Sequence, residues 1–276
     1  GTIKVIVTQA SRCSIDVNSV YVPRVNAALL TLAKAEPETQ FVVCKNVHML
    51  LVLLPTLLQN HVDCFYIRFS DPSYVKMEKL KLILRLTTPS NAEIVIKELA
   101  EYVTEVDLAF VREVVATIAA VAIKVDAVAP KCTQMLLEVV SKRPELITQV
   151  ITASKNIVRK YPELLLLDAL LRDHGAESVV EEEAKVSLVW MLGEFCDFVE
   201  GGTAVLQEYF IANLLSQEQS VQLAVLTAVI KVFLRNPSGM EATLNHVLEQ
   251  LTTQCVDPDV RDRAFAYWRL LSKGVG

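Results

Sequence analysis

The four histidines are the residues of this chain that are best suited to acid–base chemistry. They are His48, His61, His174 and His246, and both His48 and His246 lie in the middle of helical patterns, where surface or core histidines are common. Nucleophilic catalysis needs a base held beside a nucleophile, together with a site for the developing oxyanion. Nothing in the sequence assembles these three parts, so we predict that the chain is not an enzyme.

Metal, redox and nucleotide chemistry is not indicated either. The six cysteines, at positions 13, 44, 64, 132, 196 and 255, include no pair with zinc-type or redox spacing. Cys44, Cys132 and Cys196 lie in apolar helical patterns, which are typical of buried reduced thiols. Gly201 and Gly202 precede a helix but lack the strand and third glycine of a dinucleotide-binding turn. We expect no catalytic residue, no metal and no cofactor.

Charged side chains gather at two places. Glu181-Glu182-Glu183 opens a helix, where negative charge suits the helix dipole. Lys155 and Arg159 are one turn apart on one helical face. That basic pair could meet an acidic partner or a phosphoinositide, although an ordinary solvated face explains most such pairs. Lys155 and Arg159 are therefore candidate partner-binding residues.

The length and the apolar composition favour a repeat array. At 276 residues the chain exceeds the size at which a single core usually stops growing, so it forms two domains or an elongated array. Hydrophobic residues make up 52% of it and its mean hydropathy is +0.37. The longest apolar runs, 114–123 and 49–58, are too short to span a bilayer. Helices buried on several sides, with apolar surface for a partner, would explain this composition.

The charge pattern argues against nucleic acid as a partner. The net charge is −5 and the basic residues form no dense block. Lipid binding by this chain alone also lacks the clustered lysines and arginines that it needs.

Apolar residues follow the helical period almost throughout the chain. The expected helices cover residues 2–9, 20–34, 38–54, 73–87, 91–104, 108–124, 128–142, 145–160, 163–173, 179–198, 203–215, 218–235, 239–253 and 258–272. Asp107 is the expected N-cap of one of them. Three serine–glutamate pairs match the capping box: Ser90 with Glu93, Ser178 with Glu181, and Ser238 with Glu241.

The expected helices repeat at a regular interval. Apolar residues near the start of every second helix are 33, 36, 36, 37, 37 and 39 residues apart, at Val42, Val75, Val111, Ile147, Ala184, Val221 and Val260. This is the length of one helix pair in an α-solenoid. We predict an all-α fold, a right-handed α-α superhelix of the armadillo/HEAT kind with about seven helix pairs, as a single domain over residues 1–276.

The segment 218–235 indicates how such helices pack. Its polar residues form a thin line of Gln222, Thr227, Lys231 and Arg235, and almost all the rest is apolar. A surface helix needs only one apolar stripe, so this helix should be covered on three sides, with its polar line on the concave surface.

Several segments, in order and at suitable spacing between about residues 37 and 272, resemble the β-adaptins, the β large subunits of clathrin-adaptor complexes. They are Asp71–Leu80, Glu101–Asp107, Ala122–Val125, Arg159–Pro162, Trp190–Phe195, Val221–Leu223, Lys231–Leu234, Asp257–Arg263 and Tyr267–Ser272. The resemblance implies the C-terminal part of an adaptin trunk, without the N-terminal repeats, hinge or appendage.

The resemblance also implies partners and a location. β-Adaptin trunks embrace a medium subunit and pair with a second large and a small subunit, and the heterotetramer selects cargo and assembles a coat. It is cytoplasmic and peripheral on trans-Golgi, endosomal or plasma-membrane coated vesicles, and clathrin would bind only through the absent hinge. Phe195 falls in a segment similar to one near the medium subunit's signal-binding domain, which makes it a third candidate partner-binding residue.

One short motif within the chain imitates a trafficking signal. The run Leu164–Asp168 fits a clathrin-box pattern, but such peptides bind as extended strands. Here the run continues into further leucines of an expected helix, so we predict that it packs in the core.

Two other classes of helical-repeat protein stay open as alternatives. One is an armadillo-type nuclear transport receptor. Such receptors carry a ladder of Trp residues, each followed one helical turn later by Asn. The ladder is absent here, because Trp190 is followed by Glu194 and Trp268 by Ser272. The other is a coatomer large subunit.

Overall fold

In the computed structural model, which describes residues 17–53, 57–164 and 166–273, the regular structure is entirely helical. These ranges contain thirteen α-helices, α2 to α14, with short 3-10 turns, one π-helical stretch and no strand. None of the helices described there is long and apolar enough to cross a membrane. The expected helix at 2–9 lies outside these ranges. The predicted all-α fold class is confirmed.

The chain divides into two compact units, Gly1–Cys132 and Thr133–Gly276. The first contains α2 (Val17–Leu32), α3 (Pro37–Leu53), α4 (Ser73–Leu86), α5 (Ala92–Tyr102) and α6 (Leu108–Lys124). Helix α7 (Ala129–Lys142) crosses the boundary. The second contains α8 (Ile147–Lys160), α9 (Leu167–His174), α10 (Glu182–Phe195), α11 (Gly202–Val205), α12 (Gln219–Arg235), α13 (Pro237–Thr253) and α14 (Pro258–Ser272). That residues 1–276 form a single right-handed superhelix stays a prediction.

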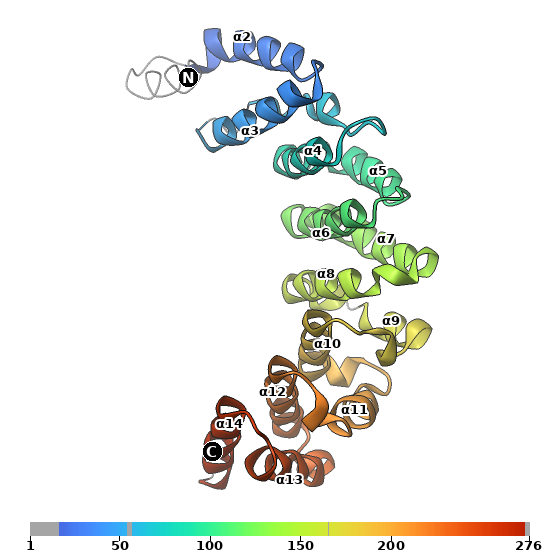
Figure 1. Cartoon of the computed structure of the whole chain (residues 1–276), viewed down its shortest axis with the longest axis vertical. Coiled ribbons are helices and arrows are strands. Elements are labelled where there is room, and N and C mark those ends of the chain that lie inside the picture. The colour runs from blue at the N-terminus through green and yellow to red at the C-terminus, as the bar shows by residue number, and fades with distance from the viewer. Residues whose placement is uncertain (1–16, 54–56, 165, 274–276) are drawn as a thin grey trace. The chain divides into compact units, whose positions relative to one another are not determined.

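Within each unit, a set of helices stacks into a layer, which is α3, α4 and α6 in the first unit and α8, α10 and α12 in the second (Figure 1). In the first unit α3 packs on α4 and α4 on α6, while α5 packs beside α6. In the second unit α8, α10, α12 and α14 pack in sequence, and α13 lies against both α12 and α14. This order of neighbours is that of an α-solenoid, in which each helix pair contacts the next.

The apolar positions that mark the repeat explain why these helices stack. Val75, Val111, Ala184, Val221 and Val260 are wholly buried, and Ile147 is nearly so. Val42 is the exception, because it is 55% exposed on α3. Six of the seven sequence markers therefore lie in the core, whereas Val42 lies on the exposed side of α3.

Helix α12 is covered on several sides, as predicted. It packs against α10, α13 and α14, and Val225, Leu226 and Val229 have no exposed surface. Gln222 was expected on its polar line, but it is buried and its Nε2 donates to the carbonyl of Gln217 at 2.9 Å. A polar side chain can be buried in this way because its hydrogen bonds are satisfied.

Buried ion pairs anchor α4 within the first unit. Lys79 Nζ lies 2.6 Å from Asp71 Oδ2, with both side chains almost fully buried. Lys76 Nζ lies 2.9 Å from Glu105, which follows α5. Charges buried to this extent need partners, so these pairs hold the loops before α4 and after α5 to the helix.

The helix starts show where local sequence patterns succeed and fail. Asp107 caps α6, accepting hydrogen bonds from the N–H groups of Ala109 and Phe110. None of the three capping boxes forms: α5 begins after Asn91, α10 begins after Glu181 without a side-chain cap, and Asn236 caps α13.

Several predicted helices are shorter than expected. The helix expected at 179–198 is α10, which covers Glu182–Phe195 and is followed by a 3-10 turn, Cys196–Phe198. The helix expected at 163–173 begins at Leu167, because residues 162–164 form a 3-10 turn. The helix expected at 203–215 is α11 followed by a π-helical stretch, Leu206–Ile211, and a 3-10 turn. Leu166, Leu167 and Leu170 are buried, as expected for the leucine-rich run.

Candidate partner-binding site

The side chain of Trp190 joins three stacked helices of the second unit. Trp190 lies half-buried on α10, which packs between α8 and α12. The guanidinium carbon of Arg159, from α8, is 5.6 Å from its ring centroid. Nζ of Lys231, from α12, is 5.9 Å from the same centroid. Both distances suit a cation–π interaction, so the indole is held between two positive charges.

Glu194 lies one turn beyond Trp190 and fixes the cations of α12. Its carboxylate accepts from Lys231 Nζ at 2.7 Å and lies 3.4 Å from Arg235 Nη2. The guanidinium of Arg235 also donates to the backbone carbonyl of Glu194. The hydrogen bond from Lys231 and the positive charges of Lys231 and Arg235 hold the pKa of Glu194 below its usual value, against the opposing effect of partial burial. Glu194 is therefore ionised at neutral pH.

Gly193 allows α10 and α12 to approach closely enough for these contacts. A Cβ atom on Gly193 would lie 2.7 Å from both Cα and Cβ of Ala228 on α12. Contacts this short do not occur between real atoms, so only glycine fits this crossing.

The aromatic end of the cluster is Phe195. Its ring lies edge-on to Trp190, with centroids 6.1 Å apart and planes at 77°. This is a favourable aromatic geometry, and the half-buried ring leaves part of its surface available. We call Arg159, Trp190, Glu194, Phe195 and Lys231 the Trp190 cluster.

The structure brings together two of the three predicted site residues. Arg159 and Phe195, from different helices, both contact Trp190. Lys155 lies half-buried one turn earlier on α8, and no contact between it and Trp190 is found. In the described part of the chain, neither Lys155 nor Arg159 pairs with a carboxylate. The sequence analysis did not name Trp190, Glu194 and Lys231 as site residues. A signal for the last two was present, because Glu194 and Lys231 have opposite charges and are 37 residues apart, which is the length of one repeat.

The remaining reactive groups do not suggest catalysis. Burial raises the pKa of Cys44 to about 11 and that of Cys132 to about 12, so both thiols stay protonated. His61, Asp63 and Cys64 have potential ligand atoms within 4.8 Å of one another on a surface turn. Burial and the charge of Asp63 raise the pKa of Cys64, which disfavours the thiolate that a metal ion requires.

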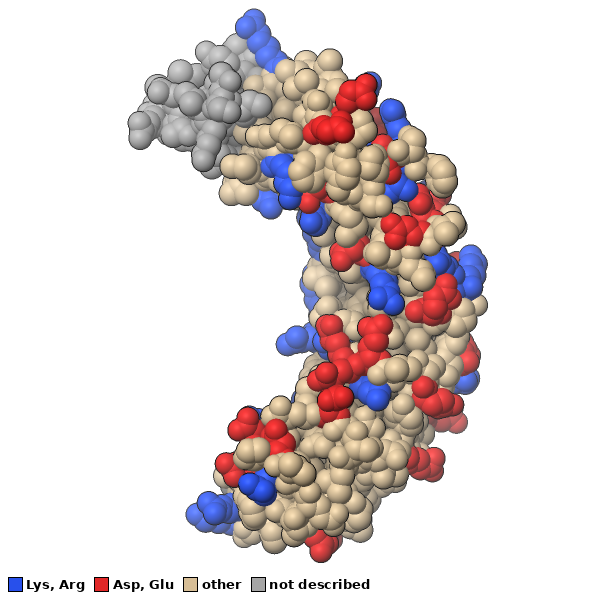
Figure 2. All heavy atoms as spheres, viewed as in Figure 1, with Lys and Arg blue, Asp and Glu red and all other residues tan. Residues whose placement is uncertain are grey.

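Charge on the surface is mixed. Figure 2 shows lysine and arginine residues interspersed with acidic ones along the visible face, without one dense block. Such a surface suits protein partners better than nucleic acid.

Comparison with known proteins identifies a matching family and several relatives. A family model described as the adaptin N terminal region matches residues 1–275. AP-1 complex subunit beta of Dictyostelium discoideum is 35% identical over 258 residues, which is 93% of this chain and 27% of that protein. AP-1 complex subunit beta-1 of Homo sapiens is 36% identical over 245 residues, 88% of this chain and 26% of that protein. AP-2 complex subunit beta of Schizosaccharomyces pombe is 32% identical over 254 residues, 91% of this chain and 37% of that protein.

The chain thus spans between about a quarter and just over a third of the length of these curated relatives. Similarity extends through both compact units, including every residue of the Trp190 cluster within the matched family region.

Proposed function

The chain belongs to the adaptin family, and from this premise we propose that it is part of a β-type large subunit of a clathrin-adaptor heterotetramer. In this role it is a scaffold in vesicle-mediated protein transport. Adaptins are structural subunits and not enzymes, in agreement with the prediction from the histidines and cysteines. The observation that carries the proposal is the similarity to adaptor β subunits over about nine-tenths of the chain.

The proposed partners are a medium, a small and a second large subunit. The stacked helix pairs support this role, because such arrays present long surfaces to other proteins. Through the complex, the protein would be cytoplasmic and peripheral on trans-Golgi, endosomal or plasma-membrane coated vesicles. Its role there would be to hold the medium subunit for cargo selection and coat assembly. The family match favours this over a nuclear transport receptor.

We assign the Trp190 cluster to the contact with the medium subunit. Aromatic residues and arginine dominate the binding energy of protein interfaces. Arg159 and Phe195 offer such groups, already oriented by Trp190, so little side-chain entropy would be lost on binding. Lys155 extends the same positive surface by one helical turn.

Co-expression tests the proposed assembly. The protein at its natural length would be produced with the medium, small and second large adaptor subunits of the same organism. We expect one species with four different chains in native mass spectrometry. A protein that elutes alone while the other three associate would contradict the proposal.

A point variant tests the proposed interface. Phe195→Ala should weaken binding to the medium subunit about tenfold or more, because truncating an aromatic residue that anchors an interface costs about 1.4 kcal/mol or more. Phe69→Ala, which removes a phenylalanine that is 84% exposed in the first unit, is the matched control and should change little. If calorimetry gave both variants the same affinity for the medium subunit, the Trp190 cluster would not be part of the interface.

A further inference from the structure

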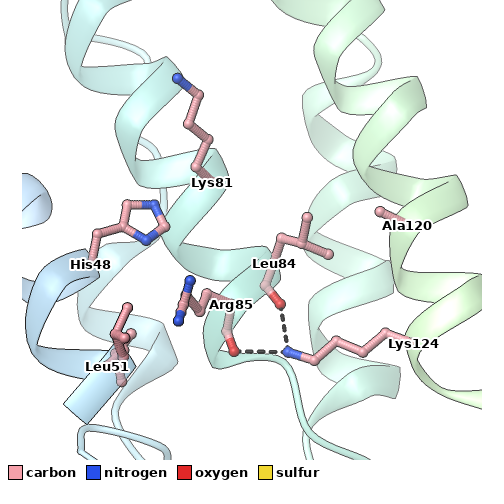
Figure 3. A pocket seen from close by; sticks show the side chains of 8 residues that line it. His48, Leu51, Lys81, Leu84, Arg85, Ala120 and Lys124 are labelled. Carbon is pink, nitrogen blue, oxygen red and sulfur yellow. Dashed lines mark hydrogen bonds between the residues drawn. The ribbon is translucent and has the colours of Figure 1, made fainter. Parts of the chain in front are cut away.

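A pocket of about 760 Å³ lies in the first unit, on a face formed by α3, α4 and α6 (Figure 3). Four of the side chains that line it are basic: His48 from α3, Lys81 and Arg85 from α4, and Lys124 from α6. No carboxylate is among the lining residues. Lys81 Nζ is paired with Glu78 at 3.1 Å, so the excess positive charge of the pocket comes from Arg85 and Lys124, although the chain as a whole is acidic.

One of these cations, Lys124, stabilises the packing of α6 on α4. Lys124 Nζ donates to the backbone carbonyls of Leu84 at 2.9 Å and Arg85 at 2.8 Å, close to the C-terminal end of α4 (Figure 3). Carbonyls at the end of a helix have no partner within it, so Lys124 satisfies them and fixes α6 against α4. Burial, and then the positive charge of Arg85, lower the pKa of Lys124.

Arg85 is an exposed cation of the pocket. In the ranges that the structure describes, no carboxylate pairs with its guanidinium. Figure 3 shows His48 and Arg85 directed toward each other from neighbouring helices. Burial lowers the pKa of His48, and the charges of Arg85, Lys81 and Lys45 lower it further, while Glu78 acts in the opposite direction. An anion placed between His48 and Arg85 would compensate the charge of Arg85 and favour the protonated form of His48.

The rest of the pocket is apolar. Leu51 from α3 and Leu84 from α4 contribute side chains beside the basic groups. An inositol phosphate, which carries many charges and hydroxyl groups, would leave this apolar wall unused. A carboxylate fits the planar guanidinium in a bidentate manner, and an adjacent apolar side chain would cover the leucines.

We propose that this pocket binds a protein segment in which an acidic residue stands next to a bulky apolar residue. Arg85 would hold the carboxylate, His48 would contribute a second hydrogen bond, and Leu51 and Leu84 would receive the apolar side chain. This binding site is separate from the Trp190 cluster and does not depend on the adaptor assembly.

The test uses the full chain and a capped, fluorescently labelled hexapeptide of alternating glutamate and leucine. We expect saturable binding in fluorescence anisotropy, reduced about tenfold or more by Arg85→Gln, because a charge-assisted hydrogen bond is lost. Arg263→Gln on α14 removes another helical arginine and is the matched control. Unchanged binding by Arg85→Gln would overturn the proposal.

Two further peptides test the chemistry of the ligand. Replacing glutamate by glutamine should abolish binding, and replacing leucine by alanine should weaken it clearly. If the glutamine peptide binds equally well, the basic groups are not the determinant and the proposal fails. It also fails if inositol hexakisphosphate binds in an Arg85-dependent manner while the peptide does not.

An NMR titration places the ligand. Bound carboxylate should raise the pKa of His48 from its lowered value, since an opposite charge favours the imidazolium. The groups that face His48 in the free protein are Lys45, Glu78, Lys81 and Arg85, with Lys124 on the opposite wall. A peptide that binds without moving the His48 titration would be bound elsewhere.

Discussion

Charged side chains in this protein often find their partners about one repeat away in the sequence. Lys231 and Glu194 are 37 residues apart, and Lys131 and Glu93 are 38 apart. Equivalent positions of successive repeats lie side by side in a stacked array, so residues one period apart come into contact. Once the period is known, pairs of opposite charge at that separation are the sequence signal for these contacts.

Short local motifs were a weaker guide. Asp107 caps its helix as predicted, but the three serine–glutamate pairs do not. Glu93 pairs with Lys131 of α7, and the hydroxyl of Ser178 donates to the carbonyl of Gly175. Residues outside the four-residue capping box thus compete for the same serine hydroxyl and glutamate carboxylate groups. A single sequence does not reveal these competing partners.

The ion pairs of Glu194 should make stability depend on pH. Its pKa is lowered in the folded state, chiefly by Lys231, so ionised Glu194 stabilises the fold above the usual glutamate pKa. This contribution is lost as the pH falls through the lowered pKa. Glu194→Gln should therefore reduce the free energy of unfolding by about 0.5–1 kcal/mol at neutral pH, because the pair is partly exposed.

Urea denaturation at neutral and acidic pH measures this effect. The difference between Glu194→Gln and the unmodified protein should shrink in acid. Glu241→Gln changes an exposed glutamate on α13 without such partners and should have little effect at either pH. A difference that persists undiminished in acid would show that the charge of Glu194 is not responsible.

At the scale of elements, hydrophobic periodicity predicted helices well. Helices α6 and α14 have the predicted bounds, and α12 begins one residue later than predicted. The largest errors are at α9, α10 and α11, where 3-10 and π turns replace parts of the expected helices without a change in apolar spacing. Periodicity reports which face is buried but not which backbone hydrogen bonds are made.

The crossing of α10 and α12 depends on one glycine. Gly193→Ala should lower the free energy of unfolding by about 1–3 kcal/mol, because the added methyl group has no room beside Ala228. The higher helix propensity of alanine, worth about 1 kcal/mol, offsets only part of this cost. Chemical denaturation monitored by circular dichroism measures the change.

Gly239→Ala is the matched substitution on α13. There the new Cβ would meet the side chain of Asn236, which would shift within its capping interaction, whereas the backbone of a neighbouring helix is not in the way. We expect a smaller loss than for Gly193→Ala. Equal losses would mean that the distance between α10 and α12 is not limited by Gly193.

At the scale of the molecule, the segments that resemble β-adaptins are largely structural. Asp71 and Lys79 form a buried ion pair, and the hydroxyl of Tyr102 accepts the N–H of Ile67 at 2.7 Å. Such residues specify a fold, which explains why the resemblance predicted the family correctly. It does not by itself identify the surface that meets a partner.

The candidate site could be predicted only in part. Arg159 came from the spacing of basic residues and Phe195 from the resemblance, and the structure places both on Trp190. Trp190 was considered in the segment that resembles the β-adaptins and in the absent ladder, but not as a site residue, because its contacts depend on how α8, α10 and α12 stack. The pocket around Arg85 was not anticipated for the same reason, since its basic groups come from three helices.

The most direct test of the central claim is purification of the protein, at its natural length, from its own cells by an affinity tag. Quantitative mass spectrometry would then identify and count the chains that accompany it. The account predicts one medium, one small and one further large adaptor subunit in equal amounts. Recovery of nuclear transport factors or coatomer subunits, or of no stable partner, would contradict it.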